Sequence, residues 1–156
     1  MIELTIPGRG TFRLKHLVSD VNGTLALDGQ LLDDASAALH AISDRLQLHL
    51  LTADTHGRQA QIDEQLGLKA VRIPRGGEAK AKAVYIQALG PESVVAVGQG
   101  ANDAGMLREA AIGIAVASIE GLAIDSLTAA DVVVPNIAAA FELLEYPTRL
   151  VATLRR

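Results

Sequence analysis

In Leu17-Val18-Ser19-Asp20-Val21-Asn22-Gly23-Thr24, a short apolar run is followed by an aspartate and then by an Asn-Gly turn, and this transition indicates the fold class. Similar transitions occur in Leu48-His49-Leu50-Leu51-Thr52 and in Val94-Val95-Ala96-Val97-Gly98-Gln99-Gly100. Strands that are buried on both faces of a parallel sheet read as apolar runs of this kind. The pattern therefore predicts parallel strands that all end in polar loops at one edge of a sheet.

Segments with helical spacing of apolar residues separate these runs, and strand–helix alternation is typical of a parallel sheet with helices on both faces. We therefore expect an α/β fold, a three-layer, Rossmann-like sheet, preceded by a β-hairpin over residues 2–14 around Pro7-Gly8-Arg9-Gly10. Asp33 or Asp34 is the expected N-cap of the first helix. Helices are expected at 35–46, 57–66, 78–89, 103–110, 120–129, 136–145 and from Pro147, and further strands at 71–73, 113–116 and 132–134.

Length and composition predict one soluble, compact domain over residues 1–156. The chain is 49% hydrophobic, carries a formal net charge of −4 and has no linker-like or repeated segment. It has no cysteine, which excludes disulfides and thiolate chemistry and agrees with a cytoplasmic location. Without a basic excess or an apolar run of about 20 residues, we expect neither nucleic-acid nor membrane binding.

The loops that follow the strands share carboxylates, hydroxyls and glycines, which together suit a phosphate bridged to a metal. Asp20 and Asp103 offer oxygen ligands of the kind that Mg²⁺ prefers. Glycine backbone amides can approach an anion closely, and Lys80 can neutralise one. Acidic and glycine residues at strand ends are also ordinary turn and helix-cap chemistry, so each loop alone has that simpler interpretation. Three such loops and a lysine favour the phosphate site.

Four segments, in this order, resemble the motifs of the haloacid dehalogenase-like superfamily of phosphatases and phosphotransferases. Ser19-Asp20-Val21-Asn22-Gly23-Thr24 resembles the family's Asp-x-Asp-Gly-Thr motif, and Leu50-Leu51-Thr52 its strand ending in Thr or Ser. Lys80 precedes an amphipathic helix, and Gly98-Gln99-Gly100-Ala101-Asn102-Asp103 is similar to Gly-Asp-Gly-x-Asn-Asp. The last motif and Leu51-Thr52-Ala53-Asp54 look most like the phosphorylation domain of P-type ATPases.

The resemblance implies a Mg²⁺-dependent phosphatase or phosphotransferase. It assigns Asp20 as the nucleophile that forms an aspartyl-phosphate, with Thr52 and Lys80 as the other catalytic residues that stabilise charge. Asp54 is a weaker candidate close to the site. The resemblance places phosphate contacts at Asn22, Gly23, Thr52, Ala53, Lys80 and Asn102. It places metal ligands at Asp20, the backbone carbonyl of Asn22, Gln99 and Asp103.

Two positions depart from the family pattern, and both are usually acidic. Asn22 stands where the phosphatases carry an acid/base aspartate, and an amide neither takes a proton from water nor protonates a leaving group at neutral pH. We therefore expect slow turnover, with Asp54 and His56 as possible substitutes. Gln99 stands where a metal-binding aspartate is usual, which predicts weaker Mg²⁺ binding. The alternative is a noncatalytic module that binds a phosphorylated ligand or another protein.

The spacing of the motifs bears on the substrate. About thirty residues separate Asp20 from Thr52, and a similar number separates Thr52 from Lys80, so no cap domain fits between them. The chain thus looks like a capless member of the family, with a site open to a small or a macromolecular phosphorylated substrate. Resembling small capless phosphatases are tetramers in which a neighbouring subunit covers the site. We therefore expect a homo-oligomer, a tetramer above all, with the hairpin at residues 2–14 in the packing.

Overall fold

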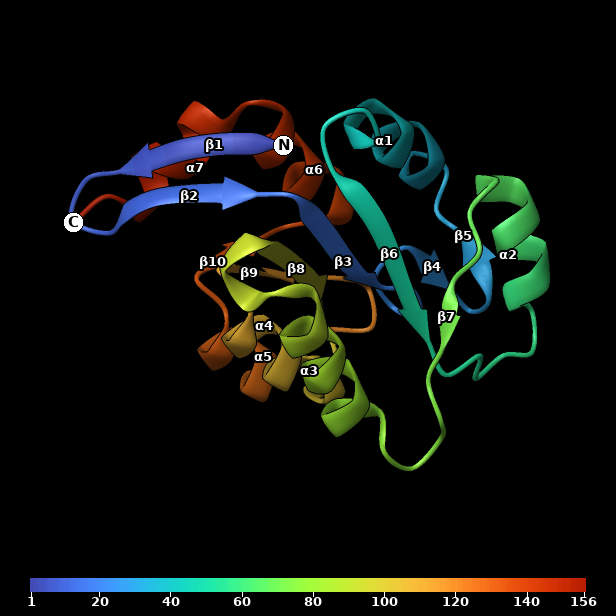
Figure 1. Ribbon diagram of the computed structural model, residues 1–156. Coiled ribbons are helices and arrows are strands. Elements are labelled where there is room, and N and C mark those ends of the chain that lie inside the picture. Colours follow the sequence, from blue (N-terminus) through green and yellow to red (C-terminus); the bar gives the residue numbers. More distant parts are fainter.

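The computed structural model describes residues 1–156, in which a parallel sheet lies between two layers of helices and an N-terminal hairpin extends to one side (Figure 1). The strands are β1 (Ile2–Ile6), β2 (Gly10–Leu14), β3 (His16–Asp20), β4 (Ala26–Leu27), β5 (Gln30–Leu31), β6 (Gln47–Thr52), β7 (Val71–Arg72), β8 (Val94–Gly98), β9 (Ile112–Val116) and β10 (Val132–Val134). The helices are α1 (Ala35–Ile42), α2 (Gln59–Leu66), α3 (Glu78–Leu89), α4 (Ala104–Glu109), α5 (Ile124–Ala129), α6 (Ile137–Glu145) and α7 (Pro147–Leu154), with short 3-10 turns η1 (Pro91–Ser93) and η2 (Ala101–Asp103).

The main sheet has six parallel strands in the order β10-β9-β8-β3-β6-β7, which confirms the expected α/β fold. From β3 the chain first adds β6 and β7 on one side and then returns to add β8, β9 and β10 on the other. The direction of strand addition therefore reverses between β3 and β8. In open α/β sheets, ligands bind outside the carboxyl ends of the strands at such a reversal. The loops after β3 and β8 meet at this point.

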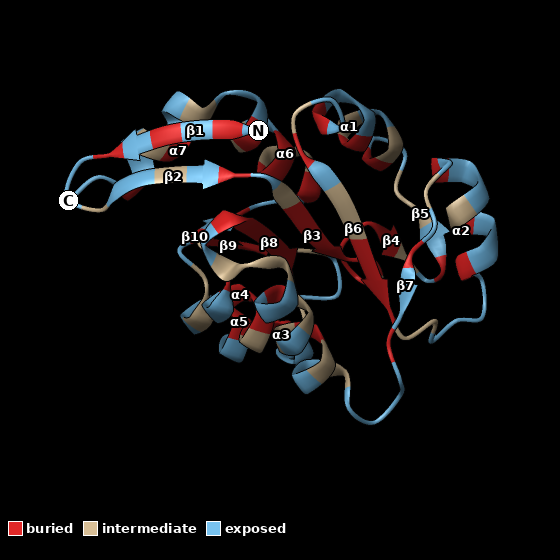
Figure 2. Cartoon of the chain, in the orientation of Figure 1, coloured by how far each residue is buried: buried red, intermediate tan, exposed pale blue.

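The central strands are buried along most of their length (Figure 2), and their alternating side chains divide the core into two layers. Leu17, Leu50 and Val95 contribute to the larger layer, which α1, α2, α6 and α7 cover. Val18 and Leu51 contribute to the smaller one, which α3 and α4 cover. Because successive strand residues point to opposite faces, one apolar run supplies both layers. The central strands are thereby fixed in position, and so are the loops that follow them.

The expected hairpin is present as β1 and β2, and its apolar face packs on the last helix, α7, of the same chain. A second, small hairpin of β4 and β5 was not expected. Asp28 and Gly29 at its turn both have positive φ, which is typical of an Asp-Gly turn between antiparallel strands. The strands on either side have only two residues each, so no alternating pattern marked them.

Three helices begin or end two or more residues inside their expected bounds. The first ends at Ile42 rather than at residue 46, α2 begins at Gln59 rather than at residue 57, and α5 begins at Ile124 rather than at residue 120. Residues 117–123 form a loop after β9, where Gly121 has a φ of 92°. Asp34 occupies the N-cap position of α1, but its side chain makes no capping hydrogen bond.

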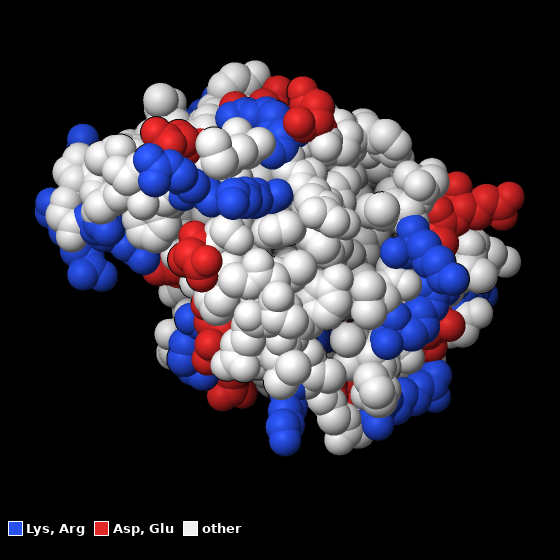
Figure 3. Space-filling view, viewed as in Figure 1, with Lys and Arg blue, Asp and Glu red and all other residues white.

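No helix of the structure combines the length and the apolar character needed to cross a membrane. On the face shown in Figure 3, basic side chains gather near the hairpin tip, where the C-terminus also lies, and along the edge near β7. A broad uncharged area lies between these two groups.

Candidate active site

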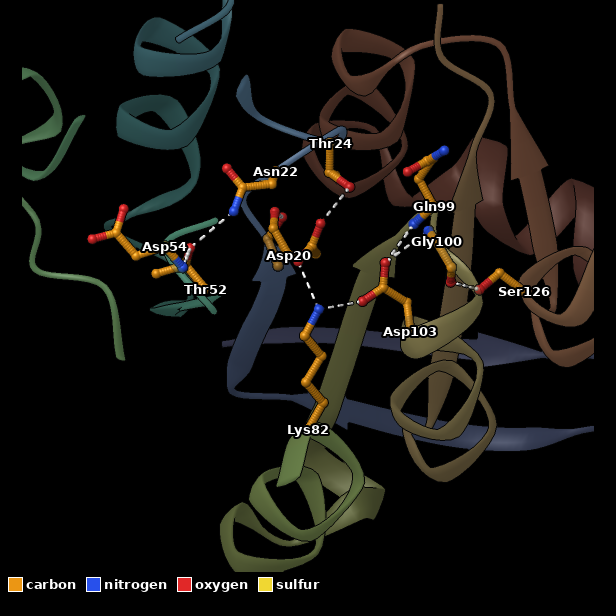
Figure 4. Close-up of polar contacts among 11 residues, drawn as sticks. Asp20, Asn22, Thr24, Thr52, Asp54, Lys82, Gln99, Gly100, Asp103 and Ser126 are labelled. Carbon is orange, nitrogen blue, oxygen red and sulfur yellow. Dashed lines mark hydrogen bonds and ion pairs between the residues drawn. The ribbon is translucent and has the colours of Figure 1, made fainter. Parts of the chain in front are cut away.

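A buried lysine lies between two buried aspartates at the carboxyl edge of the sheet (Figure 4). Lys82 Nζ is 2.7 Å from Asp20 Oδ1 and 2.7 Å from Asp103 Oδ1. Asp20 ends β3, Asp103 ends the turn after β8, and Lys82 comes from α3. Lys82 is only 1% exposed, and Asp103 is 0% exposed. Three elements distant in sequence thus place one ammonium between two carboxylates.

The charge balance of this trio raises the proton affinity of Asp20. Burial and the neighbouring Asp103 carboxylate raise the pKa of Asp20 to about 7, against the opposing effects of Lys82 and of the Thr24 hydroxyl. Burial by itself lowers the pKa of Lys82, but the charges of Asp20 and Asp103 outweigh it and raise this pKa above its usual range. Lys82 is therefore charged at neutral pH, and the trio keeps one uncompensated negative charge when both carboxylates ionise.

The structure corrects the predicted role of Lys80, because Lys82 is the lysine that contacts Asp20 and Asp103. Lys80 is exposed on α3, whereas Lys82 and Ile86 form the buried face of the same helix. Two residues of an α-helix span about 200°, so Lys80 points away from Asp20 when Lys82 points toward it. The spacing of residues along the helix could have identified Lys82, because Lys82 lies four residues before the buried Ile86 and therefore on the same face.

The glycines after β8 allow Asp103 to approach the strand closely. Its Oδ2 accepts hydrogen bonds from the backbone amides of Gln99 and Gly100, both at 2.9 Å. A Cβ at Gly98 would lie 2.6 Å from the Cβ of Asp103, so a larger residue there would displace the aspartate. Ser126 of α5 holds the same loop by donating to the carbonyl oxygen of Gly100 at 2.6 Å. The sequence pattern gave no sign of the role of Ser126.

Thr52 ends β6, is buried, and has a hydroxyl whose proton remains free to donate. Its Oγ1 accepts hydrogen bonds from Asn22 Nδ2 at 3.1 Å and from the backbone amide of Asp54 at 2.9 Å. No acceptor for its proton is present within the protein, so the hydroxyl can serve a bound anion. Asn22 therefore orients Thr52 in this structure.

Asp54 lies near this site but points away from Asp20 (Figure 4). Its Oδ1 accepts from the backbone amide of Gln59 at the start of α2, and its φ is 50°. Its carbonyl oxygen accepts from Arg75 Nη2 at 3.0 Å. These bonds make Asp54 a support for the loop after β6.

The remaining expected residues lie around the trio with different degrees of exposure. Gly23 has a φ of 81° in the loop after β3, and Thr24 Oγ1 donates to Asp20 Oδ2 at 3.2 Å. Ala53 is half-buried beside Thr52, and Gln99 is buried after β8. Asn102 is exposed in η2.

The oxygen atoms at this edge suit a hard divalent cation. No group of three or more His, Cys, Asp or Glu side chains is arranged to hold a metal. Asp20 and Asp103 nevertheless share a single ammonium, which leaves negative charge for a cation to balance. Their carboxylate oxygens are donors of the kind that Mg²⁺ prefers, whereas the amide of Gln99 points away from both aspartates (Figure 4). The residues therefore fit Mg²⁺ with fewer acidic ligands than usual.

The uncharacterized protein MJ0073 of Methanocaldococcus jannaschii is 35% identical over 92 residues, which cover 56% of this chain and 99% of the archaeal protein. The two proteins belong to the same family. No family model matches the chain.

Among solved structures, one similar to the chain is the 3-deoxy-D-manno-octulosonate 8-phosphate phosphatase of Moraxella catarrhalis in complex with magnesium, phosphate and KDO. Its TM-score is 0.69 at 18% identity, with 91% of this chain and 94% of that one covered. The chain has the haloacid dehalogenase-like fold. A zinc-transporting PIB-type ATPase in the E2·Pi state is 27% identical with a TM-score of 0.64, and the match covers 79% of this chain and 20% of the transporter.

Proposed function

We propose that the protein is a Mg²⁺-dependent phosphohydrolase or phosphotransferase that acts through an aspartyl-phosphate on Asp20. The observation that carries the proposal is the position of Lys82 Nζ, 2.7 Å from both Asp20 and Asp103, at the point where strand addition reverses. The similar phosphatase of Moraxella catarrhalis was solved in complex with magnesium and phosphate ions, which supports the same class of reaction here. Mg²⁺ bound by Asp20, Asn22 and Asp103 would supply further positive charge beside the phosphoryl group.

The proposed reaction has two displacements at phosphorus. In the first, a carboxylate oxygen of Asp20 forms a bond to phosphorus, and the bond between phosphorus and the substrate oxygen breaks, so that the leaving group departs with the electron pair. In the second, the oxygen of water or of another acceptor attacks phosphorus, and the bond to Asp20 breaks. The proton of that water passes to solvent. Lys82 and the free Thr52 proton are the groups of this chain that offset charge on the phosphoryl oxygens.

The proposed cycle lacks a residue positioned for proton transfer. Asn22 cannot act as an acid or base, Asp54 is engaged with α2, and His56 is exposed. General acid–base catalysis is worth about 10²–10⁴ in rate, so we expect a long-lived aspartyl-phosphate and a preference for good leaving groups. The same feature favours transfer to acceptors other than water.

The substrate is expected to be a phosphate ester that projects from an open site. The β4–β5 hairpin, α1 and the strand β6 itself are the elements between Asp20 and Thr52, and none of them forms a cap domain. A cavity of about 380 Å³ adjoins Gly23 and Thr24, and its other walls are largely apolar. The leaving group would enter this cavity. We keep the expectation of a cytoplasmic protein that acts as a homo-oligomer, with residues 1–156 forming a single capless domain.

The first experiment compares wild type with Asp20→Asn on p-nitrophenyl phosphate in the presence of Mg²⁺. We expect the variant to lose about 10³-fold in kcat/KM or more, because the amide that replaces the Asp20 carboxylate cannot attack phosphorus. An acid-quenched sample of the wild type should carry a phosphoryl group on the peptide that contains Asp20. Equal rates for the two proteins, or no phosphorylated peptide, would overturn the proposal.

The second experiment distinguishes a slow enzyme from a noncatalytic binding module, for which Asn22 and Gln99 are the specific observations. Asn22→Asp restores an acid/base group, and the Thr52 hydroxyl can donate to the new carboxylate, so the loop keeps its hydrogen bond. A slow enzyme should gain about 10²-fold in turnover. No gain, alone or together with Gln99→Asp, combined with binding of a phosphorylated ligand, would favour the module.

A further inference from the structure

A cavity of about 380 Å³ opens beside the loop that follows β3, and its walls come from four separate segments of the chain. Gly23 and Thr24 form one wall, and Thr24 Oγ1 donates to Asp20 Oδ2 at 3.2 Å (Figure 4). The other walls come from the region of the β4–β5 hairpin, the loop after β9 and the connection from β10 to α6: Leu27, Leu32, Val116, Ala117, Ser118, Ile119, Pro135, Asn136 and Ile137. One residue, Thr24, thus contacts both the cavity and the proposed nucleophile.

The walls of this cavity carry no charge and few free polar groups. None of the 11 lining residues is Asp, Glu, Lys or Arg. Ser118 Oγ accepts from the backbone amide of Glu120 at 3.1 Å and donates to the carbonyl oxygen of Gly121 at 3.3 Å. Asn136 Oδ1 accepts from the amide of Ala139 at 2.8 Å, which leaves Nδ2 as a free donor. Three backbone amides of the walls also donate to carbonyl oxygens of the chain: those of Gly23, Thr24 and Ala117.

Walls of this kind discriminate between leaving groups by their polarity. A charged or hydroxyl-rich group that enters the cavity gives up its hydrogen bonds to water, and the walls do not replace them, which is unfavourable. An apolar group has no such bonds to lose, and its removal from water is favourable. A cavity of about 150 Å³ holds one benzene ring, so the larger volume here has room for a substituted ring or a branched chain.

Two apolar side chains of the walls are free to contact a ligand. Ile119 lies in the loop after β9 and is 90% exposed. Leu27 is half-buried in β4 and belongs to neither of the two core layers. Because the core does not use these side chains, their apolar surface can be covered by a bound molecule without any loss to the fold.

We propose that this cavity selects phosphate monoesters of uncharged, largely apolar alcohols or phenols, with Leu27 and Ile119 as the residues that determine specificity. This inference rests on the proposed function, which requires a phosphate ester but leaves the alcohol open. Esters of sugars and other polyols are disfavoured, because several hydroxyl groups would lie against walls that offer them one free donor. That donor, Asn136 Nδ2, suits a single carbonyl or ether oxygen on the leaving group.

Two aryl phosphates that differ only at the end of a side chain test the proposal. In p-propylphenyl phosphate the chain ends in a methyl group, and in p-carboxyethylphenyl phosphate it ends in a carboxylate, so the two phenols have similar acidity as leaving groups. Wild type should prefer the propyl compound by about tenfold in kcat/KM. Leu27→Lys places an ammonium in the cavity and should reverse the preference, because the lysine attracts the carboxylate.

Ile119→Ser should reduce the preference for the propyl compound by about threefold, since less apolar surface then covers the substrate. The matched control is Ile124→Ser. Ile124 is exposed at the start of α5 and does not line the cavity, so this variant should keep the wild-type preference. Each preference is a ratio measured within one protein, so differences in the amount of folded enzyme cancel.

The outcomes separate this inference from the proposed function. Equal kcat/KM of wild type for the two aryl phosphates, or a Leu27→Lys variant that keeps the wild-type preference, would overturn the selection of apolar leaving groups while the phosphatase activity stands. Release of phosphate from acetyl phosphate but from neither aryl phosphate would also overturn the inference alone. If wild type releases phosphate from none of the three compounds, the proposed function fails, and the inference fails with it.

Discussion

Two polar clusters on the same three elements are built in opposite ways. Asp20, Thr52 and Lys82 lie toward the carboxyl ends of β3 and β6 and on α3, in a buried and charged site. Nearer the other end of these strands, His16 and His49 meet Tyr85, which also comes from α3. His16 Nδ1 is 3.1 Å from His49 Nε2, and His49 Nδ1 is 2.9 Å from the Tyr85 hydroxyl.

The two clusters differ in what burial costs them. The histidine–tyrosine cluster is half-buried and can stay neutral, because each nitrogen in contact has a donor or acceptor facing it. The trio buries two carboxylates with one ammonium, and burial of charge is expensive unless every charge is paired. The polar edge of the sheet therefore lowers the stability of the fold, as expected of a functional site.

The largest expected effect is the removal of Lys82. Lys82→Met leaves two buried carboxylates without their ammonium, and breaking a buried ion pair in this way costs about 3–5 kcal/mol. Urea unfolding at pH 8 measures the loss. Lys80→Met is the control, because Lys80 is exposed and its replacement should change the free energy of unfolding by less than about 0.5 kcal/mol. Equal stability of the two variants would contradict the central place of Lys82.

The second prediction concerns pH and Asp20 in the metal-free protein. Folding raises the pKa of Asp20 to about 7 from 3.8, so the folded state binds the extra proton and stability falls as pH rises from about 4 to 7. Asp20→Asn removes the ionisable group and with it this loss of stability. At pH 8 in EDTA the variant should be more stable by on the order of 2 kcal/mol, which is about 5 °C in Tm. At pH 4 the difference in stability between the variant and wild type should largely vanish. A difference that stays constant from pH 4 to 8 would contradict the raised pKa of Asp20.

A smaller effect is expected at the neutral cluster. Tyr85→Phe removes the hydroxyl that faces His49 Nδ1 and should cost about 1 kcal/mol of unfolding free energy, the usual value of such a hydrogen bond. The measurement is urea unfolding at pH 8. Tyr146→Phe is the control, since the Tyr146 side chain is exposed and its hydroxyl makes no hydrogen bond in the protein. Equal losses in both variants would show that the His49 contact contributes nothing.

The smallest effect has the opposite pH dependence to that of Asp20. Burial lowers the pKa of His16 and of His49, with further lowering of His16 by Lys15 and of His49 by the His16 charge. The folded state therefore binds fewer protons than the unfolded chain, and stability falls as pH drops below about 6.5. In an Asp20→Asn background, where the opposing slope is absent, His49→Gln should flatten stability between pH 7 and 5. An unchanged slope would contradict it.

The sequence predicted the sheet well, because apolar runs of strand length are a strong signal when each run ends in a polar residue. Asp20 and Thr52 end such runs, Asp103 ends the turn that follows a third one, and the structure places all three at one edge. The β4–β5 hairpin was missed because strands of two residues carry no pattern. Lys82 was not predicted, because Lys80 lies nearer the start of α3. Only the shared face with Ile86 distinguishes Lys82 from Lys80.

Contacts between distant loops were beyond prediction. Ser126 donates to Gly100, and Glu120 approaches Gly23. These pairs are far apart in the sequence, and no helical or strand periodicity relates their positions. The histidine pair was missed for the same reason, since His16 and His49 meet only because β3 and β6 pair in parallel. Residues that reach the site through tertiary packing alone are recognised only in the folded structure.

The packing of β1 on α7 joins the first and last elements of the chain. Ile2, Leu4 and Ile6 lie in the core with Leu150 and Leu154. During synthesis the hairpin leaves the ribosome well before α7 has been made, so its apolar face stays uncovered while the residues between the two elements are translated. We therefore expect a chaperone that binds nascent apolar strands to act on this hairpin until α7 packs on β1.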